Sequence, residues 1–160
     1  MLLLFIEDEE LAFWCLFEIM NSRNWRRFFM ADDSIGSEIQ QQIPTLIEQA
    51  APRLYKRMLD ADAIEAMSLS FVIPQKYIMP IFTCAMPVDV TKHIFDLFIW
   101  EQSGHLCLLR VISMCLTRVE EKCLQMSEED MFQYIRKGTF VQECIEEVPL
   151  TDLFLDSNIQ

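Results

Sequence analysis

The chain has 160 residues, of which 52% are hydrophobic and 24% are charged, and its formal net charge is -12. This length fits one domain rather than two, and the hydrophobic fraction excludes an intrinsically disordered chain. The acidic balance argues against a nucleic-acid partner or an anionic membrane surface, because both require clustered positive charge. Three glycines leave few residues for tight turns, which favours helices over an all-β fold.

The first residues, from Met1 to Ile6, are apolar and are followed by an acidic cluster from Glu7 to Glu10. The apolar run is too short to span a membrane and has no basic segment before it, so we predict neither a signal peptide nor direct membrane insertion. An apolar face of this kind needs a partner, and self-association through residues 1–6 is one possibility. The six cysteines form no C-x-x-C pair, which is typical of reduced core thiols in a cytoplasmic protein.

Residues 7–20 predict the first well-marked helix. The four acidic side chains stand where the positive end of the helix dipole favours them. After Glu10, apolar side chains recur on nearly every side of the helix, so we expect a core helix that buries large rings. Residues 25–30 then form a short aromatic turn that carries Arg26 and Arg27, either as a solvated pair or as a partner contact.

Periodic apolar residues and proline breaks divide the middle of the chain into further helices. An amphipathic helix is predicted from Ser37 to Ala50, with a kink or restart at Pro44, and Pro52 separates it from the basic segment 53–59. Residues 60–62 are a polar join, and an apolar helix resumes over 64–73 before Pro74. Residues 77–86 are almost wholly apolar, so we expect core with a kink at Pro80.

The remaining elements have recognisable starts and ends. Pro87 predicts a helix start that leads to Trp100, and the segment 101–104 ends that helix with Gly104 as a left-handed cap. Residues 106–119 form an apolar helix closed by 120–122, Ser127 caps a helix ending near Gly138, and 139–148 are helical. Together, these elements predict an all-α, irregular multi-helix domain of about seven to nine short helices over 1–150, with a flexible acidic tail at 151–160.

The residue types needed for catalysis or metal binding do not come together in the sequence. His93 and His105 are the only histidines, and neither has the spacing of a metal ligand pair. Cys107 lies two residues from His105, a spacing that puts the two on different helix faces and opposes a cysteine-dependent enzyme. No phosphate-binding glycine motif is present, so we predict no catalytic residue, metal or cofactor.

Several segments nevertheless resemble the C-terminal half of the TBC domain, the all-helical domain of GTPase-activating proteins for Rab small GTPases. The leucine run, acidic turn and A-F-W sequence of residues 2–14 resemble the start of that half, and P-x-L, aromatic, M-P and H-I-F-D segments follow in the family's order. The residues that carry the resemblance are Glu10, Ala12, Phe13, Trp14, Pro52, Leu54, Tyr77, Phe82, Pro87, His93, Phe95 and Asp96. Tyr77 and Phe95 stand where the family favours Trp, and His93 stands where Arg is usual.

The resemblance implies mainly structural roles for these residues, a GTP-bound Rab as partner, and recruitment to endomembranes in vesicle trafficking. The family's catalytic arginine and glutamine lie in I-x-x-D-x-x-R and Y-x-Q-G motifs of the N-terminal half, and neither motif occurs in this sequence. We therefore expect a truncated domain that activates a GTPase only if the missing half is supplied. The alternative is an all-helical interaction scaffold unrelated to GTPases, with partner contacts around Arg26 and Arg57.

Overall fold

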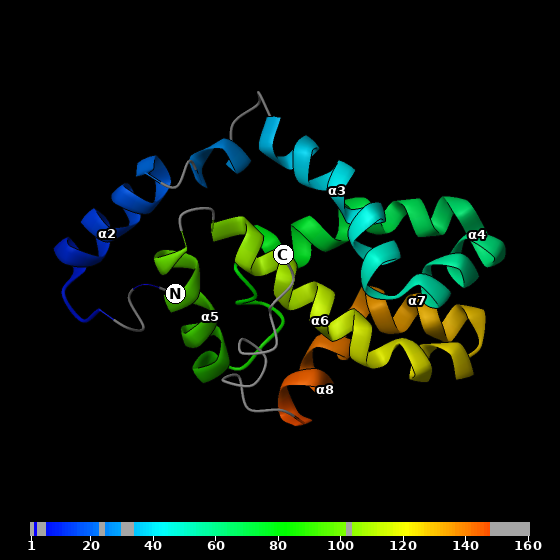
Figure 1. The fold of residues 1–160 in the computed structure, drawn as a ribbon. Helices are drawn as coiled ribbons and strands as arrows, with labels where there is room; N and C mark the ends of the chain where they lie inside the picture. The colour runs from blue at the N-terminus through cyan, green and yellow to red at the C-terminus, as the bar shows by residue number, and fades with distance from the viewer. Residues whose placement is uncertain (1, 3–5, 23–24, 30–33, 102–103, 148–160) are drawn as a thin grey trace.

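The computed structural model describes residues 2, 6–22, 25–29, 34–101 and 104–147, and within these ranges it is all-α, without a strand. Figure 1 shows a row of helices with α2 at one end and α4 and α7 at the other. The elements are α2 (Glu9–Ser22), the 3-10 helix η1 (Trp25–Phe29), α3 (Ser34–Ala50), α4 (Pro52–Ile73), the π-helical turn η2 (Pro74–Ile78), α5 (Val88–Trp100), α6 (Gly104–Gln125), α7 (Glu128–Lys137) and α8 (Thr139–Glu147).

Helix α6 is the central element of the fold. It runs through the middle of the molecule and packs against α3, α4, α5 and α8 (Figure 1). Its side chains Leu108, Ile112, Cys115 and Leu116 are completely buried, as expected for a helix that has neighbours on several sides. The predicted all-α fold is therefore confirmed, with its core built around α6.

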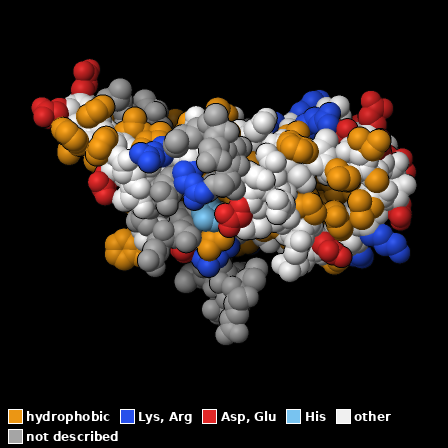
Figure 2. All heavy atoms as spheres, turned by 90° about the horizontal axis from the view of Figure 1, so that it is seen from above, with side chains coloured by type: hydrophobic (Ala, Val, Ile, Leu, Met, Phe, Trp, Pro, Cys, Tyr) orange, Lys and Arg blue, Asp and Glu red, His pale blue; other side chains and the backbone are white. Residues whose placement is uncertain are grey.

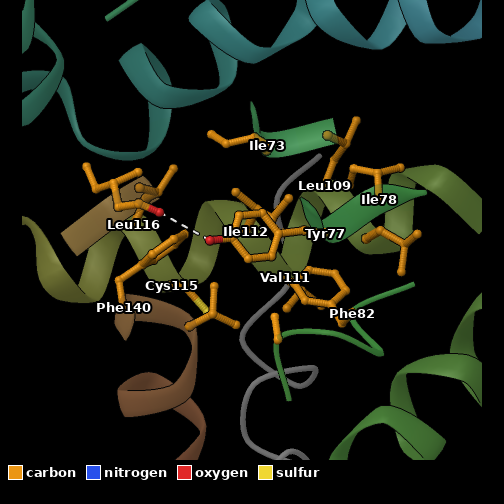
Figure 3. Packing of buried hydrophobic residues seen from close by; sticks show 14 of the residues in the cluster. Ile73, Tyr77, Ile78, Phe82, Leu109, Val111, Ile112, Cys115, Leu116 and Phe140 are labelled. Carbon is orange, nitrogen blue, oxygen red and sulfur yellow. Dashed lines mark hydrogen bonds between the residues drawn. The ribbon is translucent and has the colours of Figure 1, made fainter. Parts of the chain in front are cut away.

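The tyrosine of η2 lies at the centre of this core. Tyr77 is fully buried, and its ring centroid lies 5.7 Å from that of Phe82 and 5.8 Å from that of Phe140 (Figure 3). Its hydroxyl donates a hydrogen bond of 3.1 Å to the carbonyl oxygen of Ile135 in α7. Burying each ring contributes on the order of 2 kcal/mol, and the hydrogen bond satisfies the only polar atom of the tyrosine side chain.

Several predicted helix boundaries are confirmed. Pro52 is the first residue of α4, and Pro87 is the N-cap of α5. Ser127 caps α7 by accepting a hydrogen bond of 3.2 Å from the backbone N–H of Asp130. Gly138 ends α7 with φ 86°, in the left-handed conformation that glycine adopts without steric cost.

The prediction that the first helix lies in the core is wrong. Of the side chains of α2, only Ala12 and Ile19 are buried. Five large apolar side chains are between 42% and 58% exposed: Leu11, Phe13, Trp14, Leu16 and Phe17. The helix is apolar on nearly every side, but Figure 1 shows it at one end of the row, and its main packing neighbour among the described elements is the short η1.

Two other expectations need correction. Gly104 is the first residue of α6 and not a left-handed cap. Helix α6 continues beyond 120–122 to Gln125, and Glu120 within it binds Arg53 of α4.

The expected helix end before Pro74 is confirmed, because α4 ends at Ile73 and Pro74 opens η2. Helix α3 continues through Pro44, so the helix does not restart there. The predicted acidic tail, 151–160, lies outside the described residues.

Candidate functional site

An apolar groove along α2 is the candidate site. Its volume is about 580 Å³, and α2, η1, α5 and the segment after η2 form its walls. The lining side chains are Leu2, Glu9, Ala12, Phe13, Leu16, Ile19, Met20, Trp25, Phe29, Met79, Ile81 and Phe95. Only Glu9 among them is charged, so the groove suits an apolar side chain or helix face rather than a polar metabolite.

A second groove of about 620 Å³ lies on the other side of the same helix. Cys15, Glu18 and Ser22 line it from α2, and Ile99 lines it from α5. Because Ile19 and Phe95 line both grooves, α2 meets the rest of the molecule along a narrow ridge. This explains why so much of its apolar surface remains uncovered.

The local sequence makes α2 a well-formed helix despite this exposure. The Oδ1 atom of Asp8 accepts a hydrogen bond of 3.0 Å from the backbone N–H of Leu11, which caps the helix start. The ring of Trp14 makes edge contacts with Phe13, at a centroid distance of 5.4 Å, and with Phe17, at 5.8 Å. The outer face of α2 is therefore a row of mutually packed aromatic rings.

The structure places the residues of the family resemblance in three environments. Ala12, Phe13 and Phe95 come together at the groove along α2. Leu54, Tyr77 and Phe82 are fully buried in the core, as expected for structural residues. The others are exposed: Glu10, Trp14, Pro52, Pro87, His93 and Asp96.

A second exposed apolar surface lies on α4. Ile64, Met67 and Phe71 are 83%, 66% and 56% exposed. Residues 64–73 are predicted from the sequence as an apolar helix whose faces are not assigned. The spacing of these residues, at i, i+3 and i+7, indicates a stripe on one side of a helix and is the signal that could have separated them from the buried Leu69 and Ile73.

The basic segment 53–59 is largely occupied by contacts within the chain. Nη2 of Arg53 lies 3.0 Å from Oε2 of Glu120, and Arg53 also pairs with Glu121. Arg57 donates hydrogen bonds to the carbonyl oxygens of Cys123, at 3.0 Å, and Met126. These carbonyls lie at the C-terminal end of α6, where a positive charge is favourable. Arg57 therefore caps a helix, which argues against a role as a partner contact.

Cys107 and His105 do not form an activated pair. Burial raises the pKa of the Cys107 thiol to about 11 and lowers the pKa of His105, so the cysteine is protonated at neutral pH.

Within 6–22, 25–29, 34–101 and 104–147, no three His, Cys, Asp or Glu side chains form a group that could hold a metal ion. None of the helices in the described ranges is long and apolar enough to cross a membrane.

Comparison with known proteins gives one finding on the family. The model of the Rab-GTPase-TBC domain matches residues 1–124, which is most of the chain and includes the groove along α2 and Tyr77, but not its contacts Ile135 and Phe140 in α7 and α8. No curated protein and no solved structure matches the chain significantly. The chain therefore belongs to the Rab-GTPase-TBC domain family.

Proposed function

We propose that this chain is the scaffold half of a Rab-GTPase-TBC domain, which contacts a GTP-bound Rab but does not accelerate GTP hydrolysis by itself. The observation that carries the proposal is the family match over residues 1–124 in a sequence that contains neither I-x-x-D-x-x-R nor Y-x-Q-G. The match supports a Rab-type partner, and the missing motifs support the absence of catalysis by these 160 residues.

The chemistry of GTP hydrolysis explains why those two motifs matter. An arginine placed beside the γ-phosphate stabilises the charge of the transition state, and a glutamine orients the attacking water. Arginine fingers increase the rate by roughly three to five orders of magnitude. Arg26 and Gln41 are present, but neither stands in the family's motif, so we assign no catalytic role to either residue.

Single-turnover GTP hydrolysis by a panel of Rab proteins tests the catalytic half of this proposal. We expect the chain alone to leave the hydrolysis rate unchanged. The chain mixed with the N-terminal half of an active TBC domain should restore acceleration, because that half supplies both catalytic side chains. Acceleration by the chain alone would show that its own residues do the chemistry.

Binding is measured separately. Each Rab is immobilised with a non-hydrolysable GTP analogue or with GDP, and the chain is passed over both surfaces. We expect weak binding that favours the GTP form, since these 160 residues contain neither catalytic motif. The same preference would recruit the chain to the cytoplasmic face of endomembranes and place it in vesicle trafficking. Equal binding to both nucleotide forms, or none, contradicts the Rab contact.

One observation favours a second function, an interaction scaffold that has no GTPase partner. The stripe of Ile64, Met67 and Phe71 on α4 is at least 56% exposed, and none of these three residues lines either groove along α2. Exposed apolar stripes of this kind mark protein contacts. An affinity capture that recovers no small GTPase in either nucleotide state, and whose reproducible partner is lost on Met67→Asp, supports this alternative.

A further inference from the structure

The outer face of α2 carries an aligned row of side chains. Glu10, Phe13, Trp14 and Phe17 stand at i, i+3, i+4 and i+7, so they share one face of the helix. Asn21, eleven residues after Glu10, falls on the same face, because three helical turns contain about 10.8 residues. All five side chains are exposed. We call this row the α2 stripe.

The two ends of the α2 stripe carry opposite charge. Glu10 supplies a carboxylate at its first turn. At its other end, Nη1 of Arg26 lies 3.5 Å from Oδ1 of Asn21, which puts an exposed guanidinium where the stripe stops. The chain as a whole has a net charge of -12, so this positive end is a local exception. Figure 2 shows hydrophobic and acidic side chains together at the end of the molecule formed by α2.

This arrangement is self-complementary. The middle of the α2 stripe falls between positions 15 and 16, halfway between Glu10 and Asn21 and also halfway between Trp14 and Phe17. Two copies packed antiparallel about a two-fold axis at that point place Trp14 of one copy against Phe17 of the other. The same rotation places Glu10 of each copy beside Arg26 of the other, so both charged ends are paired.

We propose that two copies of this chain associate through their α2 stripes in this antiparallel arrangement. The three aromatic side chains of the α2 stripe, Phe13, Trp14 and Phe17, are 51–58% exposed and offer roughly 300 Å² per copy, since aromatic side chains bury about 150–250 Å² each. Roughly 600 Å² in total is the size of a weak interface, whose direction is set by the two Glu10–Arg26 pairs. A dimer with a Kd on the order of 100 µM is therefore expected, and it requires no GTPase.

Sedimentation velocity of the full chain, at concentrations from about 1 to about 200 µM, tests this proposal. We expect a monomer–dimer equilibrium that Trp14→Ser weakens on the order of 100-fold, because a central aromatic side chain dominates such an interface. Far-UV circular dichroism confirms that each variant stays helical. A chain that sediments as a monomer throughout, or a Trp14→Ser variant that dimerises normally, overturns the proposal.

Charge reversal tests the antiparallel arrangement itself. Glu10→Arg and Arg26→Glu each place like charges together at both ends of the stripe, so each variant alone should dimerise on the order of tenfold more weakly. An equal mixture of the two variants pairs opposite charges at both ends, and we expect it to recover the dimer. Arg26→Glu lies outside α2 and leaves that helix uninterrupted, which provides a test even if Glu10→Arg fails to fold.

Glu9→Arg is the matched control, because it makes the same charge change at the same helix start but about 100° round the helix axis from Glu10, on the side of the groove. It should leave the dimer unchanged. If Glu9→Arg weakens association as much as Glu10→Arg, or if the mixture of the two reversed variants fails to associate, then the chain does not pair through antiparallel α2 stripes.

Discussion

At the scale of single residues, a glycine and a tyrosine together complete the end of α7. The carbonyl oxygen of Ile135 accepts hydrogen bonds from the backbone N–H of Gly138, at 3.2 Å, and from the hydroxyl of Tyr77, at 3.1 Å. Gly138 has φ 86°, and a Cβ atom at this position would lie 2.5 Å from the hydroxyl oxygen of Tyr77. The site thus requires glycine for two independent reasons, backbone conformation and space.

We predict that Gly138→Ala lowers the free energy of unfolding by about 2–4 kcal/mol, combining left-handed strain with the steric clash. Tyr77→Phe alone should cost about 1 kcal/mol through the lost hydrogen bond. Because Tyr77→Phe also removes the clashing oxygen, Gly138→Ala should cost less in that background. Urea unfolding of the four proteins measures this coupling, and strictly additive effects would contradict the contact.

Cysteine reactivity gives a second prediction at the residue scale. Cys84 is exposed and Cys15 is half-buried, whereas the other four cysteines are buried. Burial raises the pKa of Cys107 and of Cys123 to about 11, so both are held as unreactive thiols. We expect an aromatic disulfide reagent at neutral pH to label Cys84 fast, Cys15 slowly, and the rest only after unfolding.

Cys84→Ser is the matched variant for this measurement. It should remove the fast labelling phase and leave the slow phases unchanged. If a fast labelling phase persists in this variant and the labelled residue is Cys107, then that thiol is activated beside His105. Such a result would support a cysteine-dependent activity.

At the scale of elements, α4 is two helical pieces joined at an aspartate. Asp62 has φ -157° and ψ 101°, outside the helical region. Its Oδ1 atom accepts hydrogen bonds from the backbone N–H groups of Ile64, at 2.9 Å, and Glu65, at 3.0 Å. The side chain therefore acts as an N-cap that restarts the helix, which explains why the polar join predicted at 60–62 bends the chain without ending the element.

We predict that Asp62→Ala lowers the free energy of unfolding by about 1 kcal/mol, the usual cost of losing an N-cap. Asp62→Asn should lose much less, because an asparagine oxygen can accept the same two hydrogen bonds. Thermal unfolding of the three proteins measures the difference. Equal losses for alanine and asparagine would mean that charge, and not capping, is what this position supplies.

The elements differ in how far the sequence predicts them. Pro52, Pro87, Ser127 and Gly138 mark helix boundaries through local chemistry, which the sequence shows directly. The surroundings of α2 depend on which elements lie beside it, and no local pattern contains that information. For the same reason, the groove that brings Ala12 and Phe13 of α2 to Phe95 of α5 could not be predicted from spacing.

At the scale of the whole molecule, apolar surface is exposed at both ends of the row of helices. Figure 1 shows α2 at one end of the row and α4 and α7 at the other. The α2 stripe and the stripe of Ile64, Met67 and Phe71 share no residue and no helix, so we expect them to take different partners. Association through α2 would therefore leave the α4 stripe available, and substitutions in one stripe should not change binding at the other.

Net charge acts on the whole molecule as well. A formal charge of -12 makes the folded chain repel itself, and this repulsion opposes the compact state. The ion pairs that offset it lie near the surface: Arg110 and Glu101, 2.9 Å apart, have side chains that are 44% and 34% exposed. Exposed pairs of this kind contribute little to stability. Salt therefore removes little stability by screening these pairs, and it adds more by screening the repulsion of the net charge.

We therefore predict that the melting temperature rises by about 2–5 °C when sodium chloride increases from about 20 to about 300 mM. Thermal unfolding followed by circular dichroism at about 1 µM chain measures this, because the proposed dimer is mostly dissociated at that concentration. Sodium fluoride at the same ionic strength is the control for effects specific to chloride. A melting temperature that falls with salt would mean that the surface ion pairs, including Arg53 with Glu120 between α4 and α6, outweigh the repulsion of the whole chain.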